Sequence, residues 1–356
     1  MGLGERIKRA REAAGLSLRA AAEKTDLSHT AISKFEKGIA TPTSNSLIQL
    51  ARAFSVRTEF FLRPTTAQLE QPEFRKRSTL GAKQLKRITA DILDQVERFS
   101  ELLDLFPKRP TAEFKVPTKV SREIAELDGI EDAAVAVRKA WNLGLNAIPR
   151  LAETLGEHGL LVLTTDVDES GKFDGLAATV GGVPVVVVNG AWPGDRQRFT
   201  MAHELGHLVL AGRLGTGIDE ETACNRFAGA FLVPGSTVRT ELGARRSRLE
   251  PRELEVLKHE YGLSMAAWVY RAFDQGVIDN ATKEKLQRMF SVRGWRKVEP
   301  GEPVPPERPE LFERLVLRAL AEDMISTSKA AELMGESTSA FRRRLSFEFD
   351  RVPAHQ

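Results

Sequence analysis

The segment from Arg198 to Leu210, RFTMAHELGHLVL, constrains the fold most, because it is apolar on nearly every side when wound as a helix. Such a helix offers no polar face to solvent, so other elements must cover it. It nevertheless carries two histidines and a glutamate. Burying these groups without a metal or polar partners would cost several kcal/mol. The apolar side chains are Phe199, Met201, Ala202, Leu205, Leu208, Val209 and Leu210.

The two histidines have the spacing of a metal site. His203 and His207 are four residues apart, so on a helix both rings lie on one face and can bind one ion. Glu204 lies beside them as a general base, which accepts a proton from the attacking water and passes it to the leaving amine. An i, i+4 histidine pair can also lie on a solvated helix face, but the apolar flanks argue against that alternative. The pattern predicts a zinc (Zn²⁺) metalloendopeptidase site.

A catalytic zinc needs a third protein ligand and one open position. Asp219, Glu220 and Glu221 are the downstream candidates, and Glu221 is favoured. A helix beginning there would place Glu221 and Cys224 on one face, with small residues that permit close approach to the motif helix. Asn225 could then hydrogen-bond a ligand. Glu220 is the alternative ligand, although its position suits a charge at a helix N-terminus.

The segment GLSLRAAAEKTDLSHTAISKFEKG predicts two short helices joined by a tight turn, as in a helix-turn-helix. The second helix, starting at Ser28, would enter the major groove of double-stranded DNA. It presents side chains able to contact bases or phosphates, namely Ser28, His29, Thr30, Ser33 and Lys34. Residues 1–63 hold eleven Lys and Arg against six Asp and Glu, or +5, which suits a polyanion. A helical protein-binding domain with a solvated polar face is the alternative.

Composition limits the remaining choices. The single cysteine excludes both an internal disulfide and an all-cysteine zinc cluster. Cys224 could be a soft ligand, but a cysteine with apolar flanks more often lies in a core. No apolar run could span a bilayer and no secretion signal is evident, so we expect a cytoplasmic protein without a membrane role.

The expected fold class is α+β, mostly α. Residues 1–63 form an all-α DNA-binding domain, and residues 64–120 form a helical connector. Its long helix, about Ala82 to Leu105, is a possible dimerisation element, and the alternative is that it packs against the peptidase domain. Residues 121–298 form a zincin-like domain with a small sheet of Val-rich strands. Residues 299–356 comprise a Pro-rich linker and a helical C-terminal region in which we read no chemistry. No internal repeat is evident.

Two resemblances sharpen these expectations. RFTMAHELGHLVL followed by DEETACNRFAGAFLVP resembles the ImmA/IrrE family of zinc metallopeptidases over roughly residues 131–278. This implies His203 and His207 as ligands, Glu204 as base and Glu221 as third ligand, with Cys224 where alanine is usual. Residues 3–62 resemble the Cro/C1-type (XRE) repressors. Leu18 stands where that family places glutamine, so Arg19 or a backbone N–H is expected to take over the phosphate contact.

The predicted function is therefore a DNA-binding transcriptional regulator carrying a gated zinc peptidase with a role in stress response. It would bind a two-fold operator as a homodimer. The peptidase would cleave a repressor, another partner or the chain itself. The alternatives are a non-proteolytic repressor or antitoxin whose zinc domain senses a ligand or partner. His259 and Tyr261 come late enough in the chain to approach the cleft, where one could stabilise the oxyanion.

Overall fold

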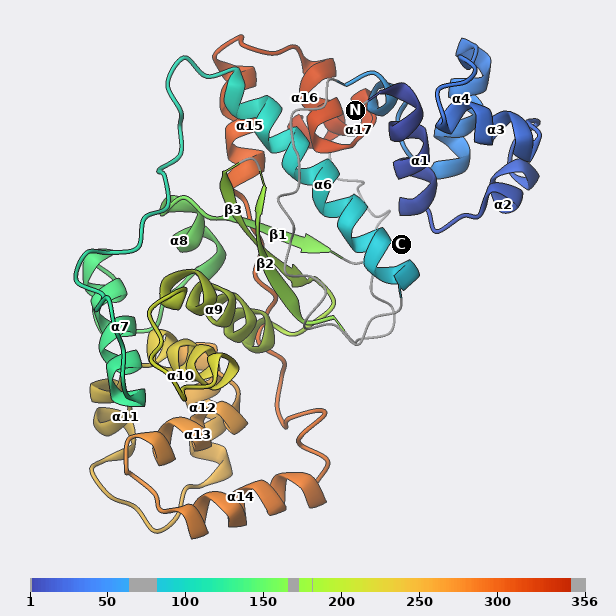
Figure 1. The fold of residues 1–356 in the computed structure, drawn as a ribbon. Helices are drawn as coiled ribbons and strands as arrows, with labels where there is room; N and C mark the ends of the chain where they lie inside the picture. The colour runs from blue at the N-terminus through green and yellow to red at the C-terminus, as the bar shows by residue number, and fades with distance from the viewer. Residues whose placement is uncertain (1, 64–81, 166–172, 181, 347–356) are drawn as a thin grey trace, which may run out of the picture.

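A computed structural model describes residues 2–63, 82–165, 173–180 and 182–346 (Figure 1). It is mostly helical with one small mixed sheet, which confirms the expected fold class. Buried apolar side chains form three clusters: one inside the N-terminal domain and one on each face of the sheet. No helix in the described ranges is long and apolar enough to cross a membrane.

The N-terminal domain, called the reader below, is a bundle of short helices closed by apolar side chains such as Ile7, Ala21 and Ile32, none of which is exposed. Ser17 and Ser28 cap the second and third helices, each by accepting a hydrogen bond from a backbone N–H three residues on. Its elements are α1 (Leu3–Ala13), α2 (Leu18–Glu23), α3 (His29–Glu36), α4 (Ser44–Phe54) and the 3₁₀ helix η1 (Thr58–Phe61).

The sheet has the order β1-β3-β2, with β1 (Leu161–Thr165), β2 (Gly175–Val180) and β3 (Val183–Asn189). β1 runs parallel to β3, whereas β2 is antiparallel to it. Alternate side chains of β3 point to opposite faces, so Val186 and Val188 join one core and Val185 and Val187 the other. Both faces are therefore apolar and both need a covering layer of helices.

The motif helix α9 (Gly194–Leu210) packs on one face of the sheet, and α10 (Glu220–Leu232) packs beside it (Figure 1). Further helices share the apolar core on this side of the sheet: α7 (Leu127–Ala140), α8 (Leu151–Glu157), α11 (Gly235–Leu242), α12 (Pro251–Tyr261), α13 (Met265–Asp274) and α14 (Asn280–Val292). The motif helix contains the whole segment from Arg198 to Leu210 and begins four residues before it, at Gly194.

The second face is covered by segments that are far apart in the sequence. Helix α6 (Ala82–Asp104) shares a core with α15 (Leu311–Ala321), α16 (Thr327–Met334) and α17 (Thr338–Leu345). Ile92 and Val96 of α6 are fully buried there. The apolar stripe of α6, which suggested a dimerisation element, thus packs within the chain.

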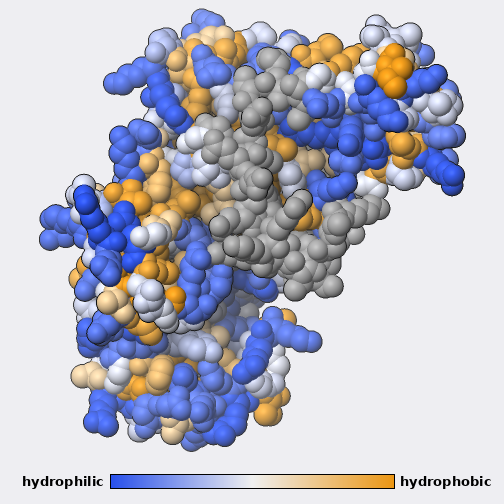
Figure 2. Space-filling view, viewed as in Figure 1, coloured by the Kyte–Doolittle hydropathy of each residue, from blue (hydrophilic) through white to orange (hydrophobic). Residues whose placement is uncertain are grey.

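The reader docks on α6 through buried charges. Glu97 of α6 is 4% exposed and accepts hydrogen bonds from Arg6 and Arg9 of α1 at 3.2 and 2.6 Å. Arg63, just after η1, pairs with Asp94 of α6 at 3.1 Å. On the face seen in Figure 2, the reader is mostly hydrophilic with isolated hydrophobic side chains. The described reader and the sheet layers are therefore joined by specific ion pairs.

The Pro-rich linker is an extended chain, as expected, but hydrogen bonds and an ion pair attach it to neighbouring helices. Glu299 accepts hydrogen bonds from the backbone N–H groups of Met265 and Ala266 at the start of α13. Glu307 does the same for the first residues of α8 and pairs with Arg198 of α9. Each carboxylate lies at a helix N-terminus, where negative charge is stabilising. Residues 299–310 form a strap fixed to α8, α9 and α13.

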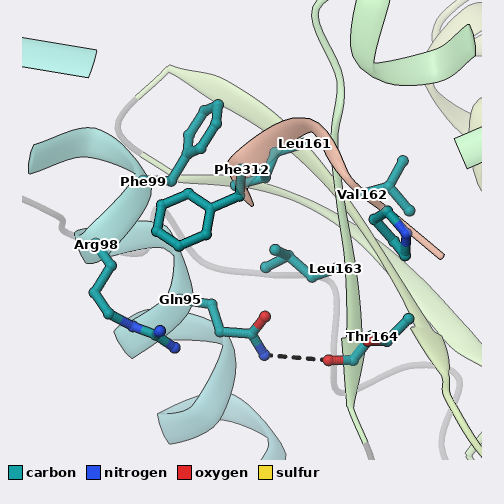
Figure 3. A pocket seen from close by; sticks show the side chains of 9 residues that line it. Gln95, Arg98, Phe99, Leu161, Val162, Leu163, Thr164 and Phe312 are labelled. Atoms are coloured by element: carbon teal, nitrogen blue, oxygen red, sulfur yellow. Dashed lines mark hydrogen bonds between the residues drawn. The ribbon is translucent and has the colours of Figure 1, made fainter. Parts of the chain in front are cut away.

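A small cavity of about 120 Å³ lies where α6, β1 and the start of α15 meet (Figure 3). Phe99 and Phe312 form an apolar wall, and Gln95 donates a hydrogen bond from Nε2 to the carbonyl oxygen of Thr164 at 3.2 Å. None of its lining residues belongs to α9 or α10. The cavity is thus separate from the histidine pair.

Candidate metal centre and DNA-reading surface

The close approach of α9 and α10 brings the candidate ligands together. A Cβ on Gly206 would lie 3.3 Å from Cα of Cys224, so the glycine inside the motif lets the two helices pack tightly. Asp219 starts α10 by accepting a hydrogen bond from the N–H of Thr222 at 2.8 Å. This cap places the first turn of α10, with Glu220 and Glu221, over the histidines.

Three ligand atoms converge on one point. Nε2 of His203 lies 3.0 Å from Nε2 of His207. One carboxylate oxygen of Glu221 lies 3.3 Å from Nε2 of His203, and the other lies 3.8 Å from Nε2 of His207. Zinc bonds of 2.0–2.2 Å in a tetrahedron imply separations between ligand atoms of about 3.3–3.6 Å. The three residues therefore fit a zinc ion.

The other ring nitrogens of both histidines face acceptors on α10. Nδ1 of His203 lies 3.0 Å from Oδ1 of Asn225, and Nδ1 of His207 lies 2.8 Å from Oε1 of Glu220. With Nδ1–H donating to these oxygens, each Nε2 lone pair is left to bind a metal. The sequence suggested Asn225 for this role. It gave Glu220 only as an alternative ligand or a helix charge, and missed its bond to His207.

A second group of potential ligands shares one histidine with the first. Sγ of Cys224 lies 3.1 Å from Nδ1 of His207, and these two atoms lie close to the carboxylate of Glu220. This group would bind an ion through Nδ1 of His207 instead of Nε2. Cys224 has no exposed surface, as expected of a small core residue. The group also leaves out His203, which faces Glu221, so the set of His203, His207 and Glu221 explains more of the geometry.

Glu204 is 6% exposed and follows His203 on α9. A buried carboxylate next to a metal site could hold a proton during the attack of water on a peptide carbonyl. Thr200 lies one turn before, where its methyl group meets Gly175 at the start of β2. The motif helix therefore lies directly against an edge strand of the sheet.

His259 and Tyr261, the two candidates for stabilising the oxyanion, make no bond to the helices that carry the candidate ligands over the described part of the chain. Tyr261 is 5% exposed and donates its hydroxyl to Oε1 of Glu241 at 2.8 Å. Burial, followed by this hydrogen bond, raises the pKa of Tyr261 well above its usual range. His259 lies exposed on α12. Neither is joined to α9 or α10 by a hydrogen bond or ion pair within the described residues.

The reader presents its predicted DNA-contacting residues at the surface. Arg19 on α2 is exposed, as are Ser28, His29, Thr30 and Lys34 at or within α3, while Ser33 is half-buried. Oγ of Ser28 accepts a hydrogen bond from the N–H of Ala31 at 3.1 Å, so this residue caps the helix. Within the described residues, no hydrogen bond or ion pair that docks the reader on α6 comes from α3. The face of α3 remains accessible to a partner.

Comparisons with known proteins agree with both surfaces. Residues 155–273 match the IrrE N-terminal-like domain of a peptidase family, and residues 7–61 match a helix-turn-helix domain. The chain is also 34% identical over 62 residues to the HTH-type transcriptional regulator ImmR of Bacillus subtilis (strain 168). That match covers 17% of this chain and 49% of the relative, so it spans about half of the relative's length. The two resemblances drawn from the motifs are thus confirmed.

Proposed function

We propose that this chain, which joins a helix-turn-helix domain to an IrrE N-terminal-like domain, is a transcriptional regulator whose zinc peptidase cleaves a protein in response to a signal. The observation that carries the proposal is the convergence of His203, His207 and Glu221 beside the buried Glu204. Zinc held there would polarise the peptide carbonyl and lower the pKa of water. Glu204 would take the proton from the attacking water and deliver it to the leaving amine.

The sheet supplies a place for the substrate. Among the described residues, β2 pairs only with β3, so its other side offers backbone N–H and C=O groups to an extended peptide. Because Gly175 of β2 touches Thr200 of α9, such a peptide would pass close to the motif helix. An extended segment of a repressor or partner is therefore the substrate class that fits.

The position of the reader argues against its cleavage by the peptidase of the same chain. Its contacts with the described rest of the chain are to α6, α16 and the turn that follows α16, on the face of the sheet away from α9. The described part of the reader is thus remote from the proposed zinc site of the same chain. We infer that the peptidase acts on a second polypeptide, either another protein or another copy of this chain. A homodimer on a two-fold operator would bring two copies together.

The test is Glu204→Gln in the full chain, which removes the base and keeps the side-chain shape. We expect the wild type, loaded with zinc, to cleave a repressor protein or a second copy of this chain. The variant should retain zinc and DNA binding but lose cleavage by at least ~100-fold, the lower range for a general base. Cleavage that survives in the variant would refute the assigned role. Zinc binding without cleavage by the wild type would favour the sensor or antitoxin alternative.

A further inference from the structure

The C-terminal helices repeat the sequence pattern of the reader. Ser17 to Ala31 and Ser326 to Ala340 both have the form Ser-x₃-Ala-Ala-Glu-x₄-Ser-x₂-Ala. The first serine of each segment caps one helix, and the second serine caps the next. Oγ of Ser326 accepts from the N–H of Lys329 at 3.2 Å, and Oγ of Ser337 accepts from the N–H of Ala340 at 3.1 Å. The corresponding bonds in the reader are both 3.1 Å.

The buried positions of the two segments also correspond. Ala330 of α16 takes the place of Ala21 of α2, and all their side-chain surface is buried. Phe341 of α17 takes the place of Ile32 of α3, and it too is fully buried. In each segment an eleven-residue helix, α1 or α15, precedes the pair. Two helices held by the same caps and apolar contacts make a helix-turn-helix. The expectation that the chain has no internal repeat is therefore wrong for these two segments.

We propose that α15, α16 and α17, called the C-terminal unit, form a second helix-turn-helix that binds double-stranded DNA through α17. The proposal rests on the proposed DNA binding by the reader. The residues of α17 that correspond to His29, Thr30, Ser33 and Lys34 are Thr338, Ser339, Arg342 and Arg343.

The charge on α17 suits this partner. α17 has no acidic residue and three arginines in its last turn. Arg344 is held within the C-terminal unit, where it pairs with Glu313 and Glu336. Arg342 and Arg343 are exposed, and within the described residues neither forms an ion pair. Two exposed guanidinium groups beside hydroxyl donors on a short helix fit phosphates and base edges.

The two units touch each other, so one duplex could meet both. Arg57, before η1, donates from Nη1 to the carbonyl oxygen of Glu336 in the turn between α16 and α17, at 2.5 Å. Arg63 pairs with Glu332 of α16 at 3.2 Å. In Figure 1 the C-terminal unit and the reader lie at the same end of the molecule. The C-terminal unit would therefore contact DNA next to the site read by α3.

The experiment uses the full chain and random-sequence duplexes enriched for binding to the wild type. Affinity is measured by fluorescence anisotropy over a range of salt concentrations, together with a hydroxyl-radical footprint. We expect the double variant Arg342→Ala, Arg343→Ala to bind more weakly. Its slope of log affinity against log salt should be less steep by about 2, since each phosphate contact contributes about 0.9. The footprint should also shorten at one end.

Three further variants make the result decisive. Arg342→Lys with Arg343→Lys keeps both charges, so the salt slope should return to the wild-type value. Arg293→Ala with Arg296→Ala removes two exposed arginines at or just after the end of α14, far from the C-terminal unit in Figure 1, and should change nothing. His29→Ala with Lys34→Ala tests the reader itself.

The outcomes separate the two proposals. If the Arg342, Arg343 alanine variant behaves like the α14 control while the reader variant loses binding, the C-terminal unit does not bind DNA, but the reader does. If the reader variant also binds normally, the proposed DNA reading by α3 is wrong as well. An unchanged melting temperature in every variant verifies that the fold is retained.

Discussion

Replacing Glu221 with glutamine should remove zinc, whereas the same change at Glu220 should only weaken its binding. Glu221 supplies the oxygens that face both Nε2 atoms, at 3.3 and 3.8 Å. Its loss removes an anionic ligand, so we expect an affinity decrease well beyond the ~100-fold upper range for residues that support a ligand from outside.

Glu220 acts through His207, so the expected effect of its substitution is smaller. A glutamine there can still accept the bond from Nδ1, now 2.8 Å long, but without charge. Hydrogen bonds to charged groups contribute about 1.5–3 kcal/mol and neutral ones about 0.5–1.5. The difference of about 1–1.5 kcal/mol corresponds to about tenfold in affinity. The side chain of Glu220 is 54% exposed, so solvent screening makes tenfold an upper value.

The assay is competition for zinc between the purified chain and a chromophoric chelator. Cys224→Ala serves as the matched control, because it removes a ligand atom only from the second group of potential ligands. It should bind zinc as the wild type does. If Glu220→Gln and Cys224→Ala release zinc while Glu221→Gln retains it, the ion lies at Nδ1 of His207 and the assigned geometry is refuted.

Two buried ion pairs give further predictions. Glu97→Gln should leave Arg6 and Arg9 buried beside a neutral group, at a cost of about 3–5 kcal/mol. Hydrogen exchange should then rise in α1 and α6 but not in α9, and unchanged protection would contradict the docking role. Burial alone would raise the pKa of Glu131, but Arg271 and Arg226 outweigh it and hold that pKa below its usual range. This stabilisation is therefore present above the unfolded pKa of about 4.5 and is lost as pH falls through the lower folded value. Melting temperatures of Glu131→Gln should be lower than wild type at pH 7 and converge with it in acid; parallel curves would exclude this linkage.

Local patterns predicted most of the secondary structure. The serine caps, the alternation of valines in β3 and the periodicity of α9 are set by neighbouring residues, so they can be read along the chain. The spacing of His203 and His207 is local in the same sense. The sequence favoured Glu221 over Glu220 as the third ligand, but how the two side chains lie around the histidines depends on the relative rotation of α9 and α10. That rotation follows from the contact of Gly206 with Cys224, a packing detail that spacing does not encode.

Long-range pairing was the part that the sequence could not supply. The apolar stripe of α6 predicts that one face of this helix is buried. Its own residues do not show what covers that face, which is the sheet together with helices more than 200 positions later in the chain. Likewise, proline content predicts an extended strap, whereas its attachment depends on Glu299 and Glu307 meeting helix N-termini elsewhere.

The helices that cover the second face of the sheet are made at different times during synthesis, because they are far apart in the chain. Ribosomes add about 5–20 residues per second, so α17 follows the zinc ligands of α10 by roughly 6–24 s. During that interval Leu163, Val185 and Val187 have α6 beside them in their final core but still lack α15, α16 and α17. A nascent chain would therefore contain every proposed zinc ligand before helices fully cover the second face of its sheet. Synthesis of α15 to α17, rather than completion of the zinc motif, would mark the moment when the second face of the sheet can be covered.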